Sequence, residues 1–283
     1  MSLILCIETG TDVCSVALAR GGRLVSLREE AGRDHARKVA LFADELFREA
    51  GISPRGLDAV AVGRGPGSYT GLRIGTSFAK GLCYALDVPL LAVDSLAAMA
   101  VIACDDREAG LFRSAQWESA LLCPMIDARR MEVYAEVFDT SLESRSEVAA
   151  EVVTSGSFGR FIRPEGEFFV FGSGAAKTVG VLPADGVRFI DVRPSARGLC
   201  RLAQARLDAG QVEDTAYFQL RTRVEELLSV LEEVDQALLK GRFGLDGRPP
   251  MSLEETARDL GLDLEEAAER ERRAMLALRC QNG

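Results

Sequence analysis

One glycine-rich segment constrains the fold of this chain more than any other. It reads Gly63-Arg64-Gly65-Pro66-Gly67-Ser68-Tyr69-Thr70-Gly71-Leu72-Arg73-Ile74-Gly75 and lies between a predicted strand and a predicted helix. Glycine permits positive φ angles and close approach of the backbone, and the first turn of a helix presents free N–H groups. The segment is therefore either a cradle for a phosphate group or a point of tight packing, where Gly71 and Gly75 let a second helix approach closely.

The phosphate interpretation fails the test for a P-loop, because no Gly-Lys-Ser or Gly-Lys-Thr sequence follows the glycines. A glycine-rich loop alone is a weak signal for phosphate binding. We therefore assign the segment a structural role, carried by Gly63, Gly65, Pro66, Gly67, Ser68, Thr70, Gly71 and Arg73.

Apolar periodicity indicates two successive α/β units. The first has predicted strands at 3–8, 13–19, 24–30, 58–63 and 89–93, and predicted helices at 34–50, 72–86 and from 95 onward. The second has predicted strands at 120–127, 131–138, 168–172 and 187–192, a short helix after 175 and a helix at 195–209. In each unit an antiparallel hairpin precedes the strands of a parallel sheet. The pattern predicts an α/β fold of two related lobes, residues 1–100 and 101–222.

The chain changes character after Phe218. Only helices are predicted there, at about 223–240, 252–260 and 264–279, and acidic residues outnumber basic ones. Residues 223–283 are therefore predicted to form a separate all-α module.

Composition excludes several classes of function. Lys and Arg total 34 against 43 Asp and Glu, so the net charge of −9 gives no general attraction for nucleic-acid phosphates. His35 is the single histidine, which excludes paired-histidine metal sites, and we expect no bound metal. The seven cysteines contain no CxxC pair and are expected to be buried thiols. No run is long and apolar enough to span a bilayer and no basic leader is present, so we expect a cytoplasmic protein.

The chain offers few candidates for a catalytic group. His35 lies at the start of a predicted helix that Asp34 would cap, so we expect it to be hydrogen-bonded locally or to face a partner. Asp127 and Glu132 flank a predicted hairpin. We expect them to form local ion pairs with the two arginines between them rather than a catalytic carboxylate pair.

Several segments besides the glycine-rich one match a known family. They are Ile7-Glu8-Thr9-Gly10-Thr11, Asp34-His35, Ala92-Val93-Asp94-Ser95-Leu96, Ile126-Asp127-Ala128-Arg129-Arg130-Met131-Glu132-Val133-Tyr134 and the glycines at 171–175. Through them, about 220 residues of this chain resemble the TsaB (YeaZ) family, bacterial accessory proteins of tRNA threonylcarbamoyladenosine synthesis. The resemblance implies an actin-like (ASKHA) fold of two ribonuclease-H-like lobes.

The resemblance also implies a role and partners. It implies a non-catalytic scaffold that pairs with the catalytic paralogue TsaD and works with the ATPase TsaE, while a homodimer is the other assembly it allows. The complex transfers threonylcarbamoyl to the adenosine next to the anticodon, and this subunit would contact tRNA only indirectly. The family was once labelled a glycoprotease. One histidine cannot supply the paired ligands of metal-bearing TsaD, so we expect no peptidase activity.

The same resemblance bears on nucleotide binding. Glu8, Gly10 and Thr11 resemble the first phosphate loop of actin-like ATPases, with Glu where Asp is usual. The matching loop of the second lobe reads Asp127-Ala128-Arg129 and lacks its glycine. Because half of the phosphate clamp is missing, we expect a vestigial loop and no cofactor. The alternative is an active enzyme, an ATP hydrolase or sugar-type kinase that binds Mg-ATP between Glu8 and Asp127.

The helices predicted at 36–50 and 71–86 are more apolar than one buried face requires. We therefore expect them to form the surface that contacts the partner. The expected interface residues are Val39, Phe42, Leu46, Leu72, Ile74, Gly75, Phe78 and Leu82.

Residues 231–279 resemble region four of primary sigma factors, most closely from Gly241 to Leu262. In that helix-turn-helix the third helix enters the major groove of DNA. Here the third helix begins with five acidic residues between 263 and 271, which would repel phosphates. We therefore expect a module for protein contact or dimerisation and expect it not to bind DNA. The alternative is a DNA-binding regulator.

Overall fold

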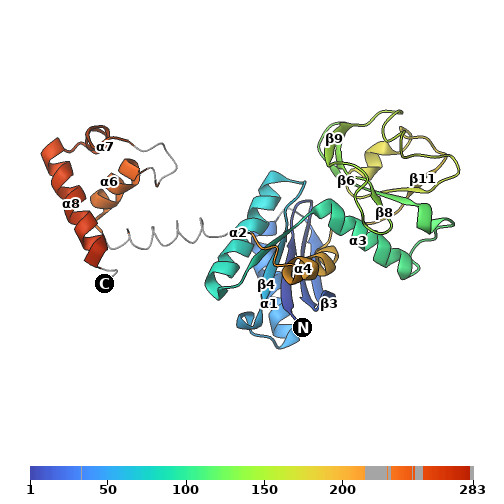
Figure 1. Ribbon diagram of the computed structural model, residues 1–283, viewed down its shortest axis with the longest axis horizontal. Coiled ribbons are helices and arrows are strands. Elements are labelled where there is room, and N and C mark those ends of the chain that lie inside the picture. Colours follow the sequence, from blue (N-terminus) through green and yellow to red (C-terminus); the bar gives the residue numbers. More distant parts are fainter. Residues whose placement is uncertain (33, 214–227, 229–230, 244, 246–250, 281–283) are drawn as a thin grey trace. The chain divides into compact units, whose positions relative to one another are not determined.

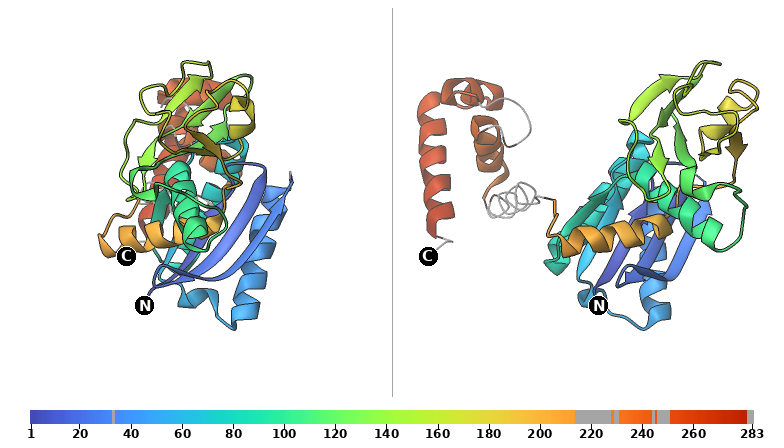
Figure 2. Two further views of the ribbon diagram at one scale, coloured as in Figure 1. Left: turned by 90° about the vertical axis from the view of Figure 1, so that its right-hand side faces the viewer. Right: turned by 45° about the vertical axis from the view of Figure 1, so that its right-hand side comes forward.

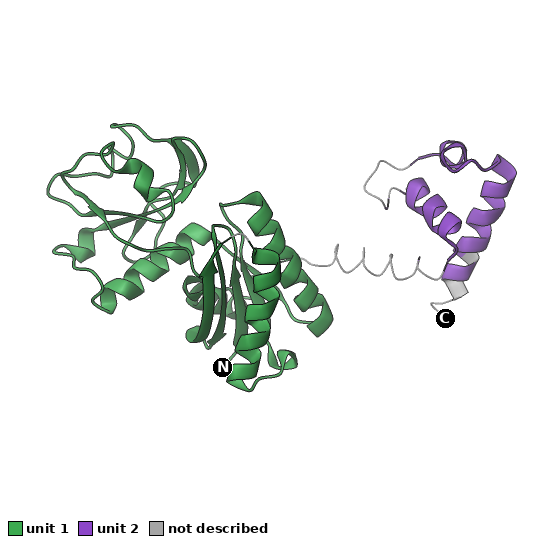
Figure 3. Cartoon of the chain, turned by 180° about the vertical axis from the view of Figure 1, so that it is seen from behind, with its two compact units in different colours: residues 1–213 green, residues 214–283 purple. Residues whose placement is uncertain are grey.

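The computed structural model describes residues 1–32, 34–213, 228, 231–243, 245 and 251–280. The chain forms two compact units, residues 1–213 and 214–283 (Figure 3). The predicted boundary between 222 and 223 lies outside the described residues. Unit 1 is a mixed α/β structure with two sheets (Figure 1), which confirms the α/β part of the predicted fold class.

The first sheet has the strand order β3-β2-β1-β4-β5. Strands β1, β2 and β3 form an antiparallel meander, and β4 and β5 extend it in parallel from β1. All five strands fall where the sequence predicts them. Their bounds are β1 Leu3–Glu8, β2 Val13–Arg20, β3 Arg23–Ala31, β4 Ala59–Gly63 and β5 Leu90–Val93.

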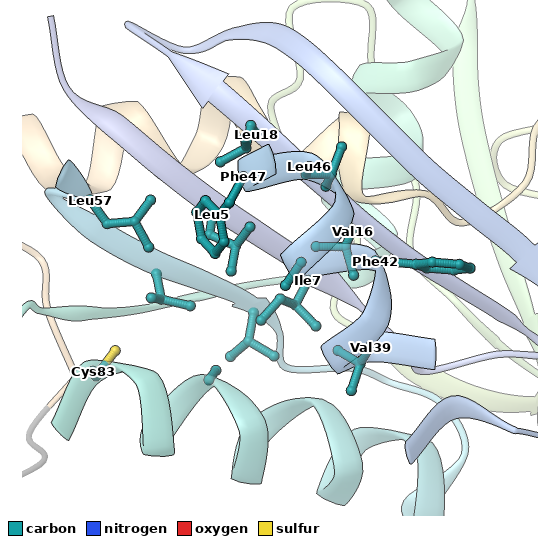
Figure 4. Close-up of a cluster of buried hydrophobic side chains, with 14 of the residues drawn as sticks. Leu5, Ile7, Val16, Leu18, Val39, Phe42, Leu46, Phe47, Leu57 and Cys83 are labelled. Atoms are coloured by element: carbon teal, nitrogen blue, oxygen red, sulfur yellow. The ribbon is translucent and has the colours of Figure 1, made fainter. Parts of the chain in front are cut away.

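Strand β1 is buried on both faces, because its alternate side chains enter two different cores. Leu5 and Ile7 pack with the helices α1 (His35–Ala50) and α2 (Tyr69–Leu86), as Figure 4 shows for the side of α1. Ile4 and Cys6 pack with helix α4 (Leu199–Asp208). Figure 2 shows the first sheet in blue between α1 and α4. Helix α4 thus returns to the first sheet, so the first lobe includes residues beyond its predicted limit at 100.

The second sheet has the order β11-β10-β6-β7-β9, with β8 paired to β6. Helix α3 (Ser95–Glu108) packs on it through Met99 and Ile102, against Phe169 and Phe171. Here the predictions are less accurate. The strand predicted at 131–138 is two short strands, and β9 lies in a region with no predicted strand. The bounds are β6 Leu121–Asp127, β7 Glu132–Ala135, β8 Phe138–Asp139, β9 Ala149–Val152, β10 Phe168–Phe171 and β11 Val187–Phe189.

Four single 3-10 turns complete unit 1. Two of them replace predicted α-helix: η3 stands for the short helix after 175, and η4 begins the helix predicted at 195–209. They are η1 Pro54–Gly56, η2 Trp117–Ser119, η3 Ala175–Thr178 and η4 Ala196–Gly198.

Unit 2 contains the helices α6 (Glu233–Phe243), α7 (Leu253–Leu260) and α8 (Leu264–Cys280). The predicted helices at 252–260 and 264–279 are confirmed. The helix predicted at about 223–240 is corrected, because residues 231 and 232 are not helical and α6 runs from Glu233 to Phe243, while most of the predicted stretch before 231 lies outside the described residues. Small apolar clusters join the helices, for example Leu238 with Ala257 and Ala267. Arg270 of α8 adds ion pairs to Asp235 (3.0 Å), Glu232 (3.4 Å) and Glu266 (3.2 Å).

Helix α2 begins at Tyr69, three residues earlier than predicted, because the Ser68 side chain accepts a hydrogen bond from the Gly71 N–H. A Cβ on Gly71 would lie 2.1 Å from the Thr9 carbonyl oxygen, and one on Gly75 would lie 2.3 Å from Thr9 Oγ1. The expectation that these glycines admit a second helix is therefore wrong. They admit the chain at the end of β1, and Thr9 Oγ1 donates a hydrogen bond to the Gly71 carbonyl at 2.8 Å.

The sequence predicts buried cysteines and no membrane-spanning run. The six cysteines whose side chains are described are buried thiols, as predicted. Within the described part of the chain, no helix is long and apolar enough to cross a membrane.

Gly71→Ala is expected to destabilise unit 1 by about 1–3 kcal/mol, because the backbone of Thr9 must move to admit the methyl group. Gly81→Ala is the matched control on the same helix, since no atom lies within 4 Å of a Cβ at that position. The control should be neutral or stabilise by up to about 1 kcal/mol through helix propensity. Urea denaturation followed by Trp117 fluorescence measures both. Equal stabilities for the two variants would contradict the packing described for Gly71.

Candidate functional site

Glu8 lies at the end of β1, and its carboxylate is enclosed by protein. Oε1 accepts a hydrogen bond from the Gly10 N–H (2.8 Å) and Oε2 accepts one from Ser95 Oγ (2.7 Å). A Cβ on Gly63 would lie 2.1 Å from Oε2, so the glycine at the end of β4 makes room for the carboxylate. Burial raises the pKa of Glu8, and the hydrogen bonds from Ser95 and Gly10 partly offset that rise. Glu8 thus links β1, β4 and the start of α3.

A cleft of about 520 Å³ lies in unit 1 beside this region. It brings together the turn after β1, the start of α2 and the hairpin after β6. Gly10 and Thr11 line it as the sequence led us to expect, but Glu8 does not. The lining residues are Gly10, Thr11, Gly67, Ser68, Tyr69, Ile126, Asp127, Ala128, Arg129, Tyr134 and Ser173.

Asp127 is held by contacts within the second lobe. Its Oδ1 accepts hydrogen bonds from Lys177 Nζ (2.6 Å) and from the Arg129 N–H (2.6 Å). Partial burial by itself would raise the pKa of Asp127, but the hydrogen bond from Lys177 and the Arg129 N–H bring it below its ordinary value. The predicted ion pair with Arg129 or Arg130 is wrong for Asp127, because Lys177 is the partner. Glu132 contributes its carbonyl oxygen to the same lysine at 3.1 Å.

The only histidine lies against the turn after β1. His35 is buried, and its Nε2 lies 2.8 Å from the carbonyl oxygen of Thr11, a residue 24 positions away rather than a sequence neighbour. Asp34 occupies the N-cap position without a side-chain capping bond, contrary to expectation, and pairs with Arg37 at 2.6 Å instead. Among the described residues, no group of three or more His, Cys, Asp or Glu side chains is arranged to hold a metal ion.

A second hollow, a groove of about 450 Å³, runs between α1 and α2. Ile74 and Phe78 lie partly exposed along it, while packing against the core below. Tyr69, 74% exposed, stands at one end, and the Arg73 guanidinium lies 5.5 Å from the centre of its ring. The lining residues are Ala36, Val39, Tyr69, Thr70, Arg73, Ile74, Ser77 and Phe78.

The structure divides the predicted interface residues into two groups. Val39, Phe42 and Leu46 are buried in the core between α1 and the first sheet, with exposures of 1%, 7% and 0%. Only Val39 of these reaches the floor of the groove. Phe42 and Leu46 are therefore corrected to core residues.

On α2 the outcome is also mixed. Gly75 packs on Thr9, Leu72 lies within 3.3 Å of a Cβ built on Gly10, and Leu82 packs on the core away from the groove. Ile74 and Phe78 are the predicted interface residues that line the groove with partly exposed side chains.

The residues of the glycine-rich segment also fall into two groups: some have the structural role predicted for them, and others line the groove. Gly63, Gly67 and Gly71 are closely approached by Glu8, Gly10 and Thr9. Ser68 caps α2, and the Gly65 carbonyl accepts a hydrogen bond from the Ser95 N–H at 3.0 Å. Thr70 and Arg73 line the groove instead. Pro66 contributes its carbonyl oxygen near Gly10.

The sequence indicated no role for four of the residues that line these hollows, Ala36, Tyr69, Ser77 and Ser173, or for Lys177, which pairs with Asp127 of the cleft. A signal existed only for Tyr69, which is a bulky aromatic residue at the first position of a helix. A side chain at the first position of a helix does not easily reach the core, so an aromatic residue there indicates an exposed ring.

Comparisons with known proteins agree on one family. The family model for TsaD, tRNA N6-adenosine threonylcarbamoyltransferase, matches residues 27–164. The tRNA threonylcarbamoyladenosine biosynthesis protein TsaB of Haemophilus influenzae is 36% identical over 160 residues, which cover 56% of this chain and 59% of that protein. A tRNA N6-adenosine threonylcarbamoyltransferase of Nitratidesulfovibrio vulgaris is 41% identical over 122 residues, covering 38% and 34%. The alignments thus span between about a third and three-fifths of these curated relatives.

A solved structure gives broader coverage. YeaZ from Pseudomonas aeruginosa is 32% identical and superposes with a TM-score of 0.63 over 76% of this chain and 97% of its own.

Glu8→Ala is expected to lower the free energy of unfolding by about 2–4 kcal/mol, because it leaves the Gly10 N–H and the Ser95 hydroxyl without their acceptor and opens a cavity. Glu8→Gln keeps the shape and an acceptor oxygen and should cost less. Urea denaturation at neutral pH compares the two. An alanine variant as stable as the parent would show that the carboxylate is dispensable for the fold.

The pH dependence of Glu8→Gln gives an independent check. Because the folded state raises the pKa of Glu8 above the ordinary value of 4.5, it holds its proton at pH values where the unfolded chain has lost it. Wild-type stability from this group should therefore fall as the pH rises from 4.5 through the raised pKa. The glutamine variant lacks that component, so its stability relative to wild type should increase over the same window. A constant difference between the two proteins would contradict the raised pKa.

Proposed function

The chain belongs to the TsaB (YeaZ) family, and we propose that it serves tRNA threonylcarbamoyladenosine synthesis as a non-catalytic subunit that pairs with a TsaD-type protein. The name of the Haemophilus relative and the near-complete coverage of YeaZ support this role. A TsaE-type ATPase is the proposed third component, and tRNA is contacted only indirectly. The actin-like description of the two lobes is part of the proposal.

The proposed pairing with a TsaD-type protein is supported most directly by the groove between α1 and α2. Ile74 and Phe78 present apolar surface there, beside an exposed tyrosine and arginine. Exposed aromatic and arginine side chains around an apolar centre are typical of protein–protein contacts. The TsaD family model itself matches residues 27–164, a stretch that contains both helices. The partner is therefore proposed to resemble this chain and to dock along the groove.

The contacts of the two carboxylates argue against the alternative of an ATP-binding enzyme. Glu8 is turned into the protein and bonded to Gly10 and Ser95, and Asp127 is paired with Lys177. Neither carboxylate is free to hold the magnesium ion of Mg-ATP without breaking these bonds. A calorimetric titration with Mg-ATP distinguishes the two hypotheses. Binding in the micromolar range that Asp127→Ala abolishes would favour the enzyme.

Unit 2 is proposed to be a protein-contact or dimerisation module with the helix-turn-helix arrangement of sigma region four. Helix α7 ends at Leu260 and is capped by Gly261, and α8 begins at Leu264. Exposed carboxylates crowd this turn and the start of α8, at Asp263, Glu265, Glu266 and Glu269. In a DNA complex of the sigma type these groups would face phosphates, which is repulsive.

Ile74→Asp and Phe78→Asp test the pairing. Each places an unpaired charge in an apolar contact, so the affinity for the TsaD-type partner should fall at least a hundredfold, or about 2.7 kcal/mol. Ala85→Asp is the matched control, because Ala85 is exposed on α2 and does not line the groove. Calorimetry with the purified partner measures all three variants. Unchanged binding by the two groove variants would contradict the assigned surface.

Unit 2 is expected to bind duplex DNA no more tightly than the roughly 10⁻⁴–10⁻⁶ M of non-specific binders. Removing residues 214–283 should leave unit 1 folded, because unit 1 has its own cores, while changing the oligomeric state or the recovery of partners. Fluorescence anisotropy with labelled duplexes and light scattering of the truncated chain check the two statements. Sub-micromolar, sequence-dependent DNA binding at physiological salt would favour the regulator hypothesis.

A further inference from the structure

The groove and the cleft share one wall residue. Tyr69 lines both hollows, because it is the first residue of α2 and stands where the groove ends and the cleft begins. Its ring is 74% exposed, and Arg73 lies against it. A molecule that fills the groove as far as Tyr69 therefore reaches the mouth of the cleft without leaving the protein surface.

The cleft offers that molecule a positive charge. Arg129 lines the cleft, and its guanidinium makes no salt bridge with any carboxylate among the described residues. The nearest carboxylate in sequence, Asp127, is already paired with Lys177. The start of α2 forms part of the same wall, and the amide end of a helix adds a partial positive charge. The cleft mouth is thus positive in a chain whose net charge is −9.

Two features favour a side chain of the docked partner over a free phosphate ligand as the occupant. First, Arg129 is the one cationic residue among those that line the cleft, and Lys177, which contacts the lining residue Asp127, is neutralised by it. One guanidinium matches one carboxylate, whereas a polyphosphate needs several cations or a metal. Second, the cleft continues directly from the apolar groove through Tyr69.

We propose that the partner surface continues from the α1–α2 groove past Tyr69 into the cleft, where an acidic side chain of the partner pairs with Arg129. This inference rests on the proposed pairing with a TsaD-type protein. It makes Tyr69 the residue that joins an apolar half of the interface to a charged half. Aromatic residues at such central positions contribute strongly to binding when they become buried.

Arg129→Ala and Arg130→Ala form the central comparison. Both arginines are exposed and adjacent on the same hairpin, but only Arg129 lines the cleft. By calorimetry with the purified TsaD-type partner, Arg129→Ala should weaken binding about tenfold or more, and this loss should shrink at high salt because the pair is ionic. Arg130→Ala should change the affinity less than twofold. Circular dichroism confirms that each variant is folded.

Tyr69 variants test the continuity of the two hollows. Tyr69→Ala should weaken partner binding by at least tenfold, and Tyr69→Phe, which keeps the ring, should retain most of the affinity. The double variant Tyr69→Ala/Arg129→Ala should lose less than the product of the single losses, because the two residues contact one continuous surface of the partner.

The outcomes separate this inference from the proposed function. Equal effects of Arg129→Ala and Arg130→Ala, together with loss of binding in Ile74→Asp, would overturn the inference and leave the pairing intact. Failure of the wild-type chain to bind the partner at all would overturn the proposed function. Titration of the isolated chain with inorganic phosphate or ATP is the remaining arm. Arg129-dependent binding of either would show that the cleft serves a free anion, which also overturns the inference.

Discussion

The contact between the turn after β1 and the first two turns of α2 sets the position of both hollows in unit 1. Gly71 and Gly75 lie against Thr9, and Gly67 lies against Gly10, whose carbonyl oxygen accepts the Ser68 N–H at 2.6 Å. Each of these contacts is closer than a side chain at Gly67, Gly71 or Gly75 would allow. Because α2 is fixed to β1 in this way, its outer face forms the groove with α1, and its amino end forms the wall of the cleft.

Much of the first lobe could be predicted because its signals are local. Strands buried on both faces are continuous apolar runs, and α1 shows helical spacing ended by Gly51 in a left-handed conformation. The strands of the second lobe were harder to predict, since β8 has two residues and β9 is largely exposed. Short or exposed strands lack the alternation of apolar and polar residues from which a strand is predicted.

The candidate site was predicted only in part, because its contacts join distant residues. An apolar residue on α1 looks the same in sequence whether it enters the core, as Leu46 does, or borders a groove, as Val39 does. Glycine spacing in α2 showed that something approaches closely, but not that Thr9 does. Lys177 is 50 residues from Asp127, and no pattern in the chain connects them.

The ion pairs of Arg270 restrict how unit 2 can change. Glu266 belongs to the exposed acidic start of α8, and it is also one of three carboxylates that hold Arg270 between α6 and α8. Replacing it with a basic residue would make the helix more suitable for DNA but would place two cations side by side in the module. Glu266 therefore contributes both to the acidic surface and to the ion pairs around Arg270, which include Asp235 of α6. Asp263, Glu265 and Glu269 do not pair with Arg270, so among these carboxylates only a change at Glu266 alters both the surface charge and the ion pairs of Arg270.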